Sequence, residues 1–441
     1  MTKKRKMLNG RTPIEALLGT FVNRDMWHTL IRDQSDKFAG LFISPTPART
    51  IIRKFMANKI FLMDCMYKTK RYQMPLLHGV GVTPTNETFT LFYCFLRFEN
   101  EELYSWAMHE LTKYFGTQDI NCDNSVFITD REIVLMNALN AVFSPLKILL
   151  YIWHINKNKL AKNRLSFGSE YGWKEFISHW QALRNSLTVG KYNGRLEKRR
   201  ELVPVRVFSC LSTIWLRYKE RFVVALARHL RHFGHVSTSR VEGAHAVLKN
   251  WLQVSTGDML EVCMKLERGC DKQERSLSVT SSYQRTHNLS ANNQPPWENI
   301  NRNISRHAMT LAGKKYLKSL APIQEPCTNI FTPSMGLPCS HRINAKQENG
   351  QVLNADDFDV HWWLVQPEDM PPTQPLDTPN FADILGQLQQ VHDSYLPHQQ
   401  LIFKNSIKQL LDKNIRVLNP VKVPTRGRLT ISTLRNPSSF E

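Results

Sequence analysis

Three acidic residues occupy positions where carboxylates could bind metal. Asp64 lies inside the apolar run 58–67, NKIFLMDCMY, a pattern typical of a central β-strand covered on both faces. Asp130 directly follows the apolar run SVFIT, and Glu242 lies near the start of the helical pattern 239–254. An ionised carboxylate in a buried strand is costly unless it is paired, hydrogen-bonded or bound to a metal ion.

Each carboxylate taken alone also has a structural explanation. Asp64 could pair with Lys68 or Arg71 at the end of its strand. The sequences around Asp130 (TDRE) and Glu242 (SRVE) both fit a capping box, in which a hydroxyl and a Glu three residues later satisfy the first N–H groups of a helix. Only their spatial relation separates these explanations from a shared site.

The elements around these residues predict a mixed α/β sheet flanked by helices. Two short helices come first, at 12–21 and 48–56. Strands and helices then alternate in the order β-β-β-α-β-α-β, at 58–67, 74–83, 87–98, 100–116, 125–129, 131–143 and 147–153. Three antiparallel strands followed by alternating helix and strand favour a sheet with helices on both faces.

This order predicts that the three carboxylates meet. The first and fourth strands of the pattern can lie side by side, so Asp64 and Asp130 project at one end of the sheet, and a helix opening beside that end adds Glu242. Three carboxylates without counter-charges repel one another, and divalent cations remove that repulsion. Two Mg²⁺ ions about 3.5–4 Å apart would hold the attacking and leaving oxygens of a phosphodiester.

Charge and composition favour a polyanionic partner. The chain has 441 residues, a formal net charge of +20 and a pI near 9.6, which favour nucleic acid. A membrane surface would need a basic amphipathic helix or a lipid signal, and neither is evident; no apolar run reaches membrane-spanning length. The basic start, MTKKRKMLNGRTP, lacks the apolar core of a signal peptide. Six of the eight cysteines lie in apolar or helical contexts typical of reduced thiols in an intracellular protein, whereas Cys327 and Cys339 are candidate metal ligands.

Several motifs together resemble the transposase core of Mutator-like elements (MULEs). They are DCMYKTKRYQMPLLHGVGVTPTNETF, TDREIVLMNALNAVF, WHINKN and TSRVEGAHAVLKNWL, and the resemblance runs from about residue 8 to 363. It implies an RNase H-like, retroviral-integrase-type fold with an inserted all-helical domain. It also implies a DDE triad of Asp64, Asp130 and Glu242 that binds two Mg²⁺ or Mn²⁺ ions.

The same resemblance implies the partners and the domain plan. The expected nucleic-acid partners are the terminal inverted repeats of the element and the target DNA. Further copies of the chain are expected to form a homo-oligomer on that DNA, and the expected location is the nucleus. The expected parts are a helical lead-in (1–56), the first part of the core (57–156), the helical insertion (157–235), the last part of the core (236–277), a linker with helices (278–324), a zinc-finger-like module (325–363) and a Pro-rich spacer with a helix and basic tail (364–441).

A small module resembles half of a SWIM-type zinc finger. Cys339 and His341 match the second half, C-x-H, whereas the first half retains only Cys327. Structural zinc usually takes four ligands, so His361 is the candidate fourth ligand. The alternative is a degenerate finger that folds without metal.

Basic residues near the triad and in the tail are candidate DNA contacts. His154, Arg240 and Lys249 follow from the core motifs, while Arg426 and Arg428 lie in TRGR, which resembles an AT-hook core. His154 could equally be a partly buried histidine at a strand end.

The resulting prediction is a DDE transposase of the Mutator-like class. Metal-activated water would cut the element end, and the 3′-hydroxyl would then attack target DNA. Departures from the family pattern keep open a domesticated or decayed copy that binds DNA and regulates transcription. These departures are Tyr151 where relatives have Cys, the incomplete finger, and a start just before the core. An RNase H-type nuclease is a third alternative, which leaves the insertion and the finger unexplained.

Overall fold

The computed structural model describes most of the chain in two compact units, Met1–Asp369 and Met370–Glu441. The described residues are 13–35, 37–55, 60–66, 74–120, 122, 125–143, 147–150, 164, 166–236, 239–252, 259–287, 296–322, 326–364, 381–395, 400 and 403–404. Within these residues, every helix is too short or too polar to span a bilayer.

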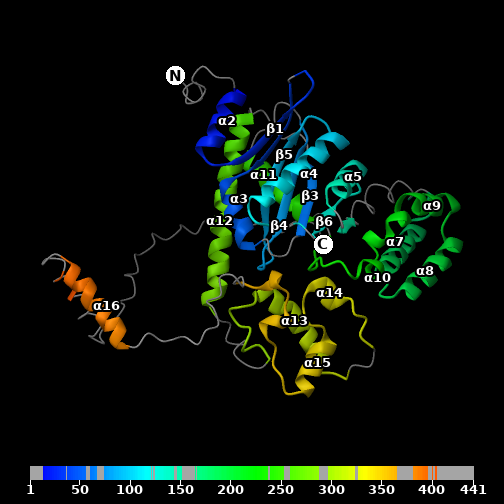
Figure 1. The fold of residues 1–441 in the computed structure, drawn as a ribbon. Coiled ribbons are helices and arrows are strands. Elements are labelled where there is room, and N and C mark those ends of the chain that lie inside the picture. The colour runs from blue at the N-terminus through cyan, green and yellow to red at the C-terminus, as the bar shows by residue number, and fades with distance from the viewer. Residues whose placement is uncertain are drawn as a thin grey trace, which may run out of the picture. The chain divides into compact units, whose positions relative to one another are not determined.

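A seven-stranded mixed sheet forms the centre of the first unit (Figure 1). Its order is β1-β2-β5-β4-β3-β6-β7. The strands are β1 (Trp27–Arg32), β2 (Phe38–Ser44), β3 (Ile60–Met66), β4 (Leu76–Val82), β5 (Thr88–Leu96), β6 (Val126–Thr129) and β7 (Lys147–Leu150). β3, β4 and β5 form the predicted antiparallel meander, and β6 and β7 add in parallel beside β3.

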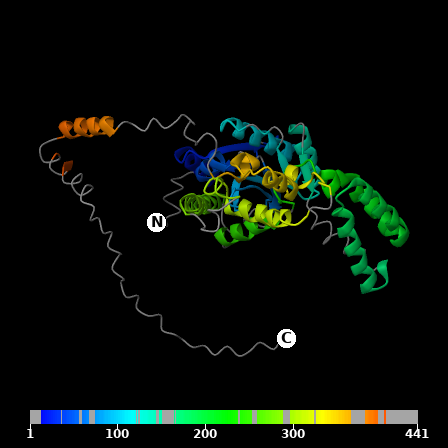
Figure 2. The same cartoon turned by 90° about the horizontal axis from the view of Figure 1, so that it is seen from below.

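Helices cover both faces of the sheet, as Figure 2 shows from below. One face, which includes Phe61 and Met63 of β3, packs on α3 (Thr46–Phe55), α4 (Glu101–Gly116) and α5 (Ile133–Val142). The other face carries Ile60 and Leu62 and packs on α11 (Ser239–Leu252). Because successive side chains of a strand point to opposite faces, the continuous apolar run of β3 suits a strand buried on both sides.

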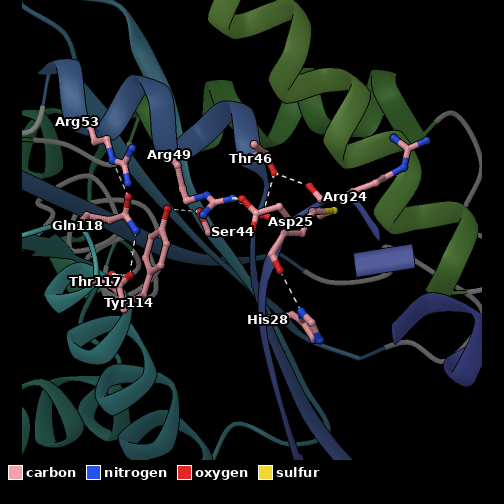
Figure 3. Close-up of polar contacts among 11 residues, drawn as sticks. Arg24, Asp25, His28, Ser44, Thr46, Arg49, Arg53, Tyr114, Thr117 and Gln118 are labelled. Atoms are coloured by element: carbon pink, nitrogen blue, oxygen red, sulfur yellow. Dashed lines mark hydrogen bonds and ion pairs between the residues drawn. The ribbon is translucent and has the colours of Figure 1, made fainter. Parts of the chain in front are cut away.

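Helix α3 is held in place by polar contacts at both of its ends (Figure 3). At its start, the Thr46 hydroxyl donates to the carbonyl of Arg24 at 2.9 Å. Arg49 forms an ion pair with Asp25 at 2.5 Å. Further along, the Arg53 Nε–H donates to the side chain of Gln118 at 2.9 Å. These contacts tie α3 to the turn that follows α2 (Pro13–Asn23) and to the end of α4.

The described residues between β7 and α11 are largely helical from residue 170 onward and have a core of their own (Figure 1). Trp180, Tyr192 and Trp215 are nearly fully buried in that core. The helices are α7 (Glu170–Arg184), α8 (Val189–Leu202), α9 (Val205–Cys210), a π-helical turn (Leu211–Trp215), a 3₁₀ turn (Leu216–Arg221) and α10 (Val224–Ala227). These three large aromatic residues therefore serve packing inside the segment.

The remaining elements follow α11. The long helix α12 (Met259–Thr286) packs on α11, α2 and α3. It is followed by α13 (Arg306–Ser319), α14 (Phe331–Met335), α15 (Ser340–Glu348) and two 3₁₀ turns (Ala355–Asp357 and Val360–Trp362). The second unit contains α16 (Phe381–Ser394).

Two expectations about local structure were wrong, and a third is tested only in part. The lead-in 1–56 is not wholly helical, since it contributes strands β1 and β2, which continue the sheet from β5. The linker expected from residue 278 is still helical as far as Thr286, because packing at Leu277 and Ser281 overrides the polar composition there. The strand expected at 147–153 is described only as far as Leu150.

Gly269 is the position where α12 approaches α11 most closely. A Cβ atom there would lie 2.0 Å from the ring of Trp251, which belongs to α11. We expect Gly269→Ala to lower the free energy of unfolding by about 1–3 kcal/mol, because the indole must be displaced. The matched control is Gly190→Ala in α8, where the added methyl meets nothing within 4 Å and should stabilise by up to about 1 kcal/mol. Urea unfolding measures both changes, and equal effects would contradict the close approach.

Candidate metal and DNA site

Asp64 and Asp130 lie at the same edge and on the same face of the sheet. β3 and β6 run parallel, with Ile60 opposite Val126 and Leu62 opposite Ile128. Asp64 is two residues beyond Leu62, and Asp130 is two residues beyond Ile128. The alternation of side chains therefore directs both carboxylates to the α11 side.

The capping-box explanation of Asp130 does not hold in the structure. Helix α5 begins at Ile133, its N-cap is Glu132, and no side chain caps it. Asp130 thus lies between strand and helix, before the first turn, and its side chain is partly exposed.

Glu242 lies in the first turn of α11, which crosses β3 on this face. Its neighbour Val241 is fully buried in the same apolar cluster as Ile60 and Leu62. Packing of Val241 therefore brings the start of the helix to the end of the strand, although 178 residues separate Asp64 from Glu242 in the sequence numbering.

The electrostatics of Asp64 show that the carboxylates interact. Its side chain is 16% exposed, and burial raises its pKa from 3.8 to about 7. That value of about 7 includes smaller upward contributions from the negative charges of Asp130, Glu242 and Glu99, and a hydrogen bond from the Cys65 N–H opposes the rise. A carboxyl surrounded by like charges is stabilised by a bound cation.

Glu99 is a neighbour that sequence reasoning missed. It lies between β5 and α4, accepts a hydrogen bond from the Tyr104 hydroxyl at 3.0 Å, and acts electrostatically on Asp64. The sequence position of Glu99 just after β5 could have predicted its location, because β5 ends at the same sheet edge as β3.

Two histidines adjoin Asp64 on the α11 face. His78 is opposite Asp64 in the β3–β4 register, and His245 lies on α11 one turn after Glu242. The rings of His78 and His245 stack with centroids 5.5 Å apart. Burial lowers the pKa of His245 to about 4, with a smaller effect of the positive charge of Lys249, and burial also lowers the pKa of His78. Both imidazoles are therefore neutral at physiological pH.

A second group of possible metal ligands lies in the 325–363 module. The ligand atoms of Cys327, Cys339 and His341 all lie within 4.8 Å of one another, and the two sulfur atoms are 3.8 Å apart. Burial would raise the pKa of Cys339, but hydrogen bonds from the Arg342 N–H and from neighbouring side chains more than offset it, so the pKa is lowered. A thiol that ionises readily suits a metal ligand.

The structure does not bring His361 into this trio. Its ring is buried against Phe233, at 4.1 Å between centroids, and beside Trp362. Among the residues that the structure describes, this trio is the one group of three or more His, Cys, Asp or Glu side chains whose ligand atoms all lie within 4.8 Å of one another. Asp64, Asp130 and Glu242 are spread more widely, which is compatible with two ions rather than one.

Residues 60–158 match the family described as MULE transposase domain. The match runs from β3 past β7 and contains both Asp64 and Asp130. The chain carries a MULE transposase domain. This match and the acidic sheet edge within it both suggest the use of divalent metal.

A similarity to one curated protein covers more of the chain. The PKS-NRPS hybrid synthetase cheA of Chaetomium globosum is 22% identical over 369 residues. The matched region covers 73% of this chain but 8% of the synthetase, so the chain spans a small part of that relative. The synthetase activity in that name refers to the much larger protein.

The predicted DNA-contact residues near the MULE domain have different environments. Arg240 donates from Nε to His235 Nδ1 at 3.1 Å and from Nη1 to the carbonyl of Asn86 at 2.9 Å, so it joins α11 to the β4–β5 turn. Lys249 is exposed on α11. His154, Arg426 and Arg428, together with Tyr151, lie outside the described residues.

We expect Arg240→Ala to destabilise the protein by about 2–4 kcal/mol, because it leaves acceptors on Asn86 and the buried His235 without their donor. Lys249→Ala removes the same charge from an exposed position of the same helix and should cost less than about 0.5 kcal/mol. Urea unfolding of the two variants tests this difference. A smaller loss for Arg240→Ala than for Lys249→Ala would show that Arg240 does not hold the turn.

Proposed function

We propose that the chain is a DNA transposase of the Mutator-like class that cleaves element ends and joins them to target DNA. Asp64, Asp130 and Glu242 are the proposed ligands of two Mg²⁺ or Mn²⁺ ions. The observation that carries the proposal is the burial of Asp64 at the sheet edge where β6 brings Asp130 and α11 brings Glu242; this environment also raises the pKa of Asp64. Buried like charges are costly without a cation, and the oxygen donors suit a hard divalent ion.

The sheet supports the finer assignment of an RNase H-like fold. Strands β5, β4 and β3 form an antiparallel meander, and β6 and β7 continue it in parallel. The helices between β7 and α11 have their own core, which supports a helical insertion between Asp130 and Glu242. In this proposal the insertion separates the second and third carboxylates along the chain, while α11 returns the third to the sheet.

Each side chain has a separate role in the proposed mechanism. Asp64 accepts a hydrogen bond from the Cys65 N–H at 2.9 Å through Oδ1, which orients Oδ2 toward the α11 side. Asp130 and Glu242 approach Asp64 from β6 and α11, so the three oxygen ligands surround the place of the scissile phosphate. The chemistry that two divalent ions supply at such a site is activation of the attacking oxygen and stabilisation of the leaving oxygen.

We further propose that Cys327, Cys339 and His341 hold a structural Zn²⁺ ion. Thiolate and imidazole are the ligands that zinc prefers, and the trio is already gathered. Cys339 is the N-cap of α15 and His341 lies in its first turn, so metal binding would secure the start of this helix.

The partners follow from charge and from the domain. A net charge of +20 favours a long polyanion, here the element terminal repeats and the target duplex. Pairing of two element ends would require a homo-oligomer assembled on DNA, in the nucleus.

A cleavage assay tests the proposal. A labelled duplex with an element terminal repeat is incubated with the full chain, with Mg²⁺ or Mn²⁺ or with a chelator. The expected result is a metal-dependent nick that leaves a 3′-hydroxyl. Duplex binding without cleavage would favour the alternative of a DNA-binding transcriptional regulator.

A further inference from the structure

His245 is placed as if it belonged to the metal site. It follows Glu242 by three residues on α11, so both side chains lie on the same side of the helix. Its Nδ1 faces Oδ2 of Asp64 at 3.8 Å, and the two side chains are 9% and 16% exposed. The pair is thus a nitrogen and an oxygen donor that face each other in a nearly closed space.

The separation of these atoms fits two ligands of one ion better than a direct contact. A hydrogen bond between nitrogen and oxygen is about 2.7–3.2 Å long, and 3.8 Å is well beyond it. Two donors that each lie about 2.1 Å from a shared ion can be separated by up to about 4.2 Å. An imidazole facing a carboxyl without a hydrogen bond gains little by itself, whereas an ion between them would use both donors.

The imidazole is also held in place from behind. The ring of His78 stacks on His245, and on its other side it stacks on Tyr93 with centroids 4.7 Å apart. His78 Nε2 lies 3.1 Å from the Thr90 hydroxyl, which fixes the plane of its ring. Among the described residues, Nε2 of His245 has no hydrogen-bond partner although it is buried. A buried unpaired N–H costs about 1–3 kcal/mol, so local stability alone does not explain this residue.

We propose that His245 is a fourth ligand of the metal site and binds the ion held by Asp64. The inference rests on the proposed function in that Asp64 is taken as a metal ligand. The inference goes beyond the proposed function because it adds a nitrogen ligand, and a nitrogen ligand changes which ion the site prefers. Mg²⁺ takes oxygen ligands almost exclusively, whereas imidazole suits transition metals. The site therefore selects Mn²⁺ over Mg²⁺.

Manganese bound to the full chain without DNA tests this directly. The protein is first loaded with Zn²⁺, so that the thiolates of the second site are occupied by the softer ion. Pulsed electron paramagnetic resonance then detects ¹⁴N coupling to Mn²⁺, and calorimetry measures the affinities for Mn²⁺ and Mg²⁺. We expect clear ¹⁴N coupling and at least about 10-fold tighter binding of Mn²⁺ than of Mg²⁺.

The variants separate His245 from its neighbours. His245→Ala and His245→Asn should both lose the ¹⁴N coupling and bind Mn²⁺ about 10- to 100-fold more weakly, with little change for Mg²⁺. His78→Asn, which alters the stack but not the facing donor, should keep the coupling. His341→Ala should keep it too, which excludes a signal from the cysteine site. Thermal melts of the metal-free variants confirm that each is folded.

Two results would overturn the inference. One is an absence of ¹⁴N coupling in the unaltered protein, and the other is coupling that persists in both folded His245 variants. The Asp64→Asn variant distinguishes failure of the His245 inference from failure of the proposed function. If it abolishes Mn²⁺ binding while no ¹⁴N coupling is seen in the unaltered chain, His245 is not a ligand but the proposed function stands. If Mn²⁺ binds equally well to Asp64→Asn, the proposed carboxylate site itself fails.

Discussion

Replacing Asp64 with asparagine is expected to lower metal-dependent cleavage of element ends by at least about 10³-fold, and at the same time to stabilise the metal-free protein. The loss of cleavage follows because Asp64 is the buried carboxylate on which the charges of Asp130, Glu242 and Glu99 all act, and ligands of catalytic metals contribute several kcal/mol to the transition state. The gain in stability follows because the amide has no charge to repel Asp130 and Glu242.

The raised pKa of Asp64 also makes the stability of the metal-free protein depend on pH. The pKa of Asp64 is about 7 in the folded chain and 3.8 as its ordinary value, so between those values the folded state holds a proton that the unfolded state has lost. Stability of the metal-free protein therefore falls as pH rises from about 4 to about 7, by roughly 4 kcal/mol at about 1.4 kcal/mol for each pH unit. Above pH 7 this contribution is constant.

Thermal or urea unfolding of the metal-free proteins from pH 4 to pH 8 measures this. Asp64→Asn should flatten the curve and be more stable than the unaltered chain at pH 8. Addition of Mn²⁺ should stabilise the unaltered chain and leave the variant unchanged, since metal binding requires the deprotonated carboxyl. The matched control is Glu102→Gln, an exposed carboxylate in the first turn of α4, which should alter neither cleavage nor stability. Undiminished cleavage in Asp64→Asn would refute the metal assignment.

Removal of zinc from the 325–363 module is expected to produce the second large effect. The unaltered chain should contain about one zinc ion, and Cys339→Ser or Cys327→Ser should lose it. Loss of a structural zinc ion costs several kcal/mol, so we expect the melting temperature to fall by about 5 °C or more. The effect should reach the MULE domain, because Leu337 and Ile343 beside the cysteines pack in the same apolar cluster as Leu62 of β3.

Zinc content by mass spectrometry and melting curves with and without a zinc chelator test this expectation. Cys210→Ser, which changes a partly buried thiol of the helical segment, is the control and should keep both zinc and stability. His361→Ala separates two further possibilities. If it retains zinc, its buried ring serves packing against Phe233; if it loses zinc, the module rearranges to recruit it. A chain that carries no zinc and melts normally would favour the degenerate finger.

The elements around the triad were predictable because their signals are local. Apolar runs bounded by turn residues marked β3, β4 and β5, and the continuity of the first run indicated a strand buried on both faces. By contrast, β1 and β2 were missed. β1 is half-exposed along most of its length, so it lacks a continuous apolar run, and β2 is defined by pairing with β5, about 50 residues further on. Pairing of this kind leaves no local signal.

By itself, the sequence determined the kinds of chemistry present: three carboxylates at strand and helix ends, a set of cysteines and histidines that could bind zinc, and a charge suited to DNA. Residue type and short-range pattern are properties of the chain. Only the tertiary structure removed the capping-box explanation of Asp130, since it starts α5 at Ile133, and only it placed His245 against Asp64 while keeping His361 out of the group formed by the cysteines and His341. The physical reason is that burial and neighbouring charge, which set the pKa of Asp64, depend on residues that are far apart in the sequence and are brought together by packing of α11 on β3.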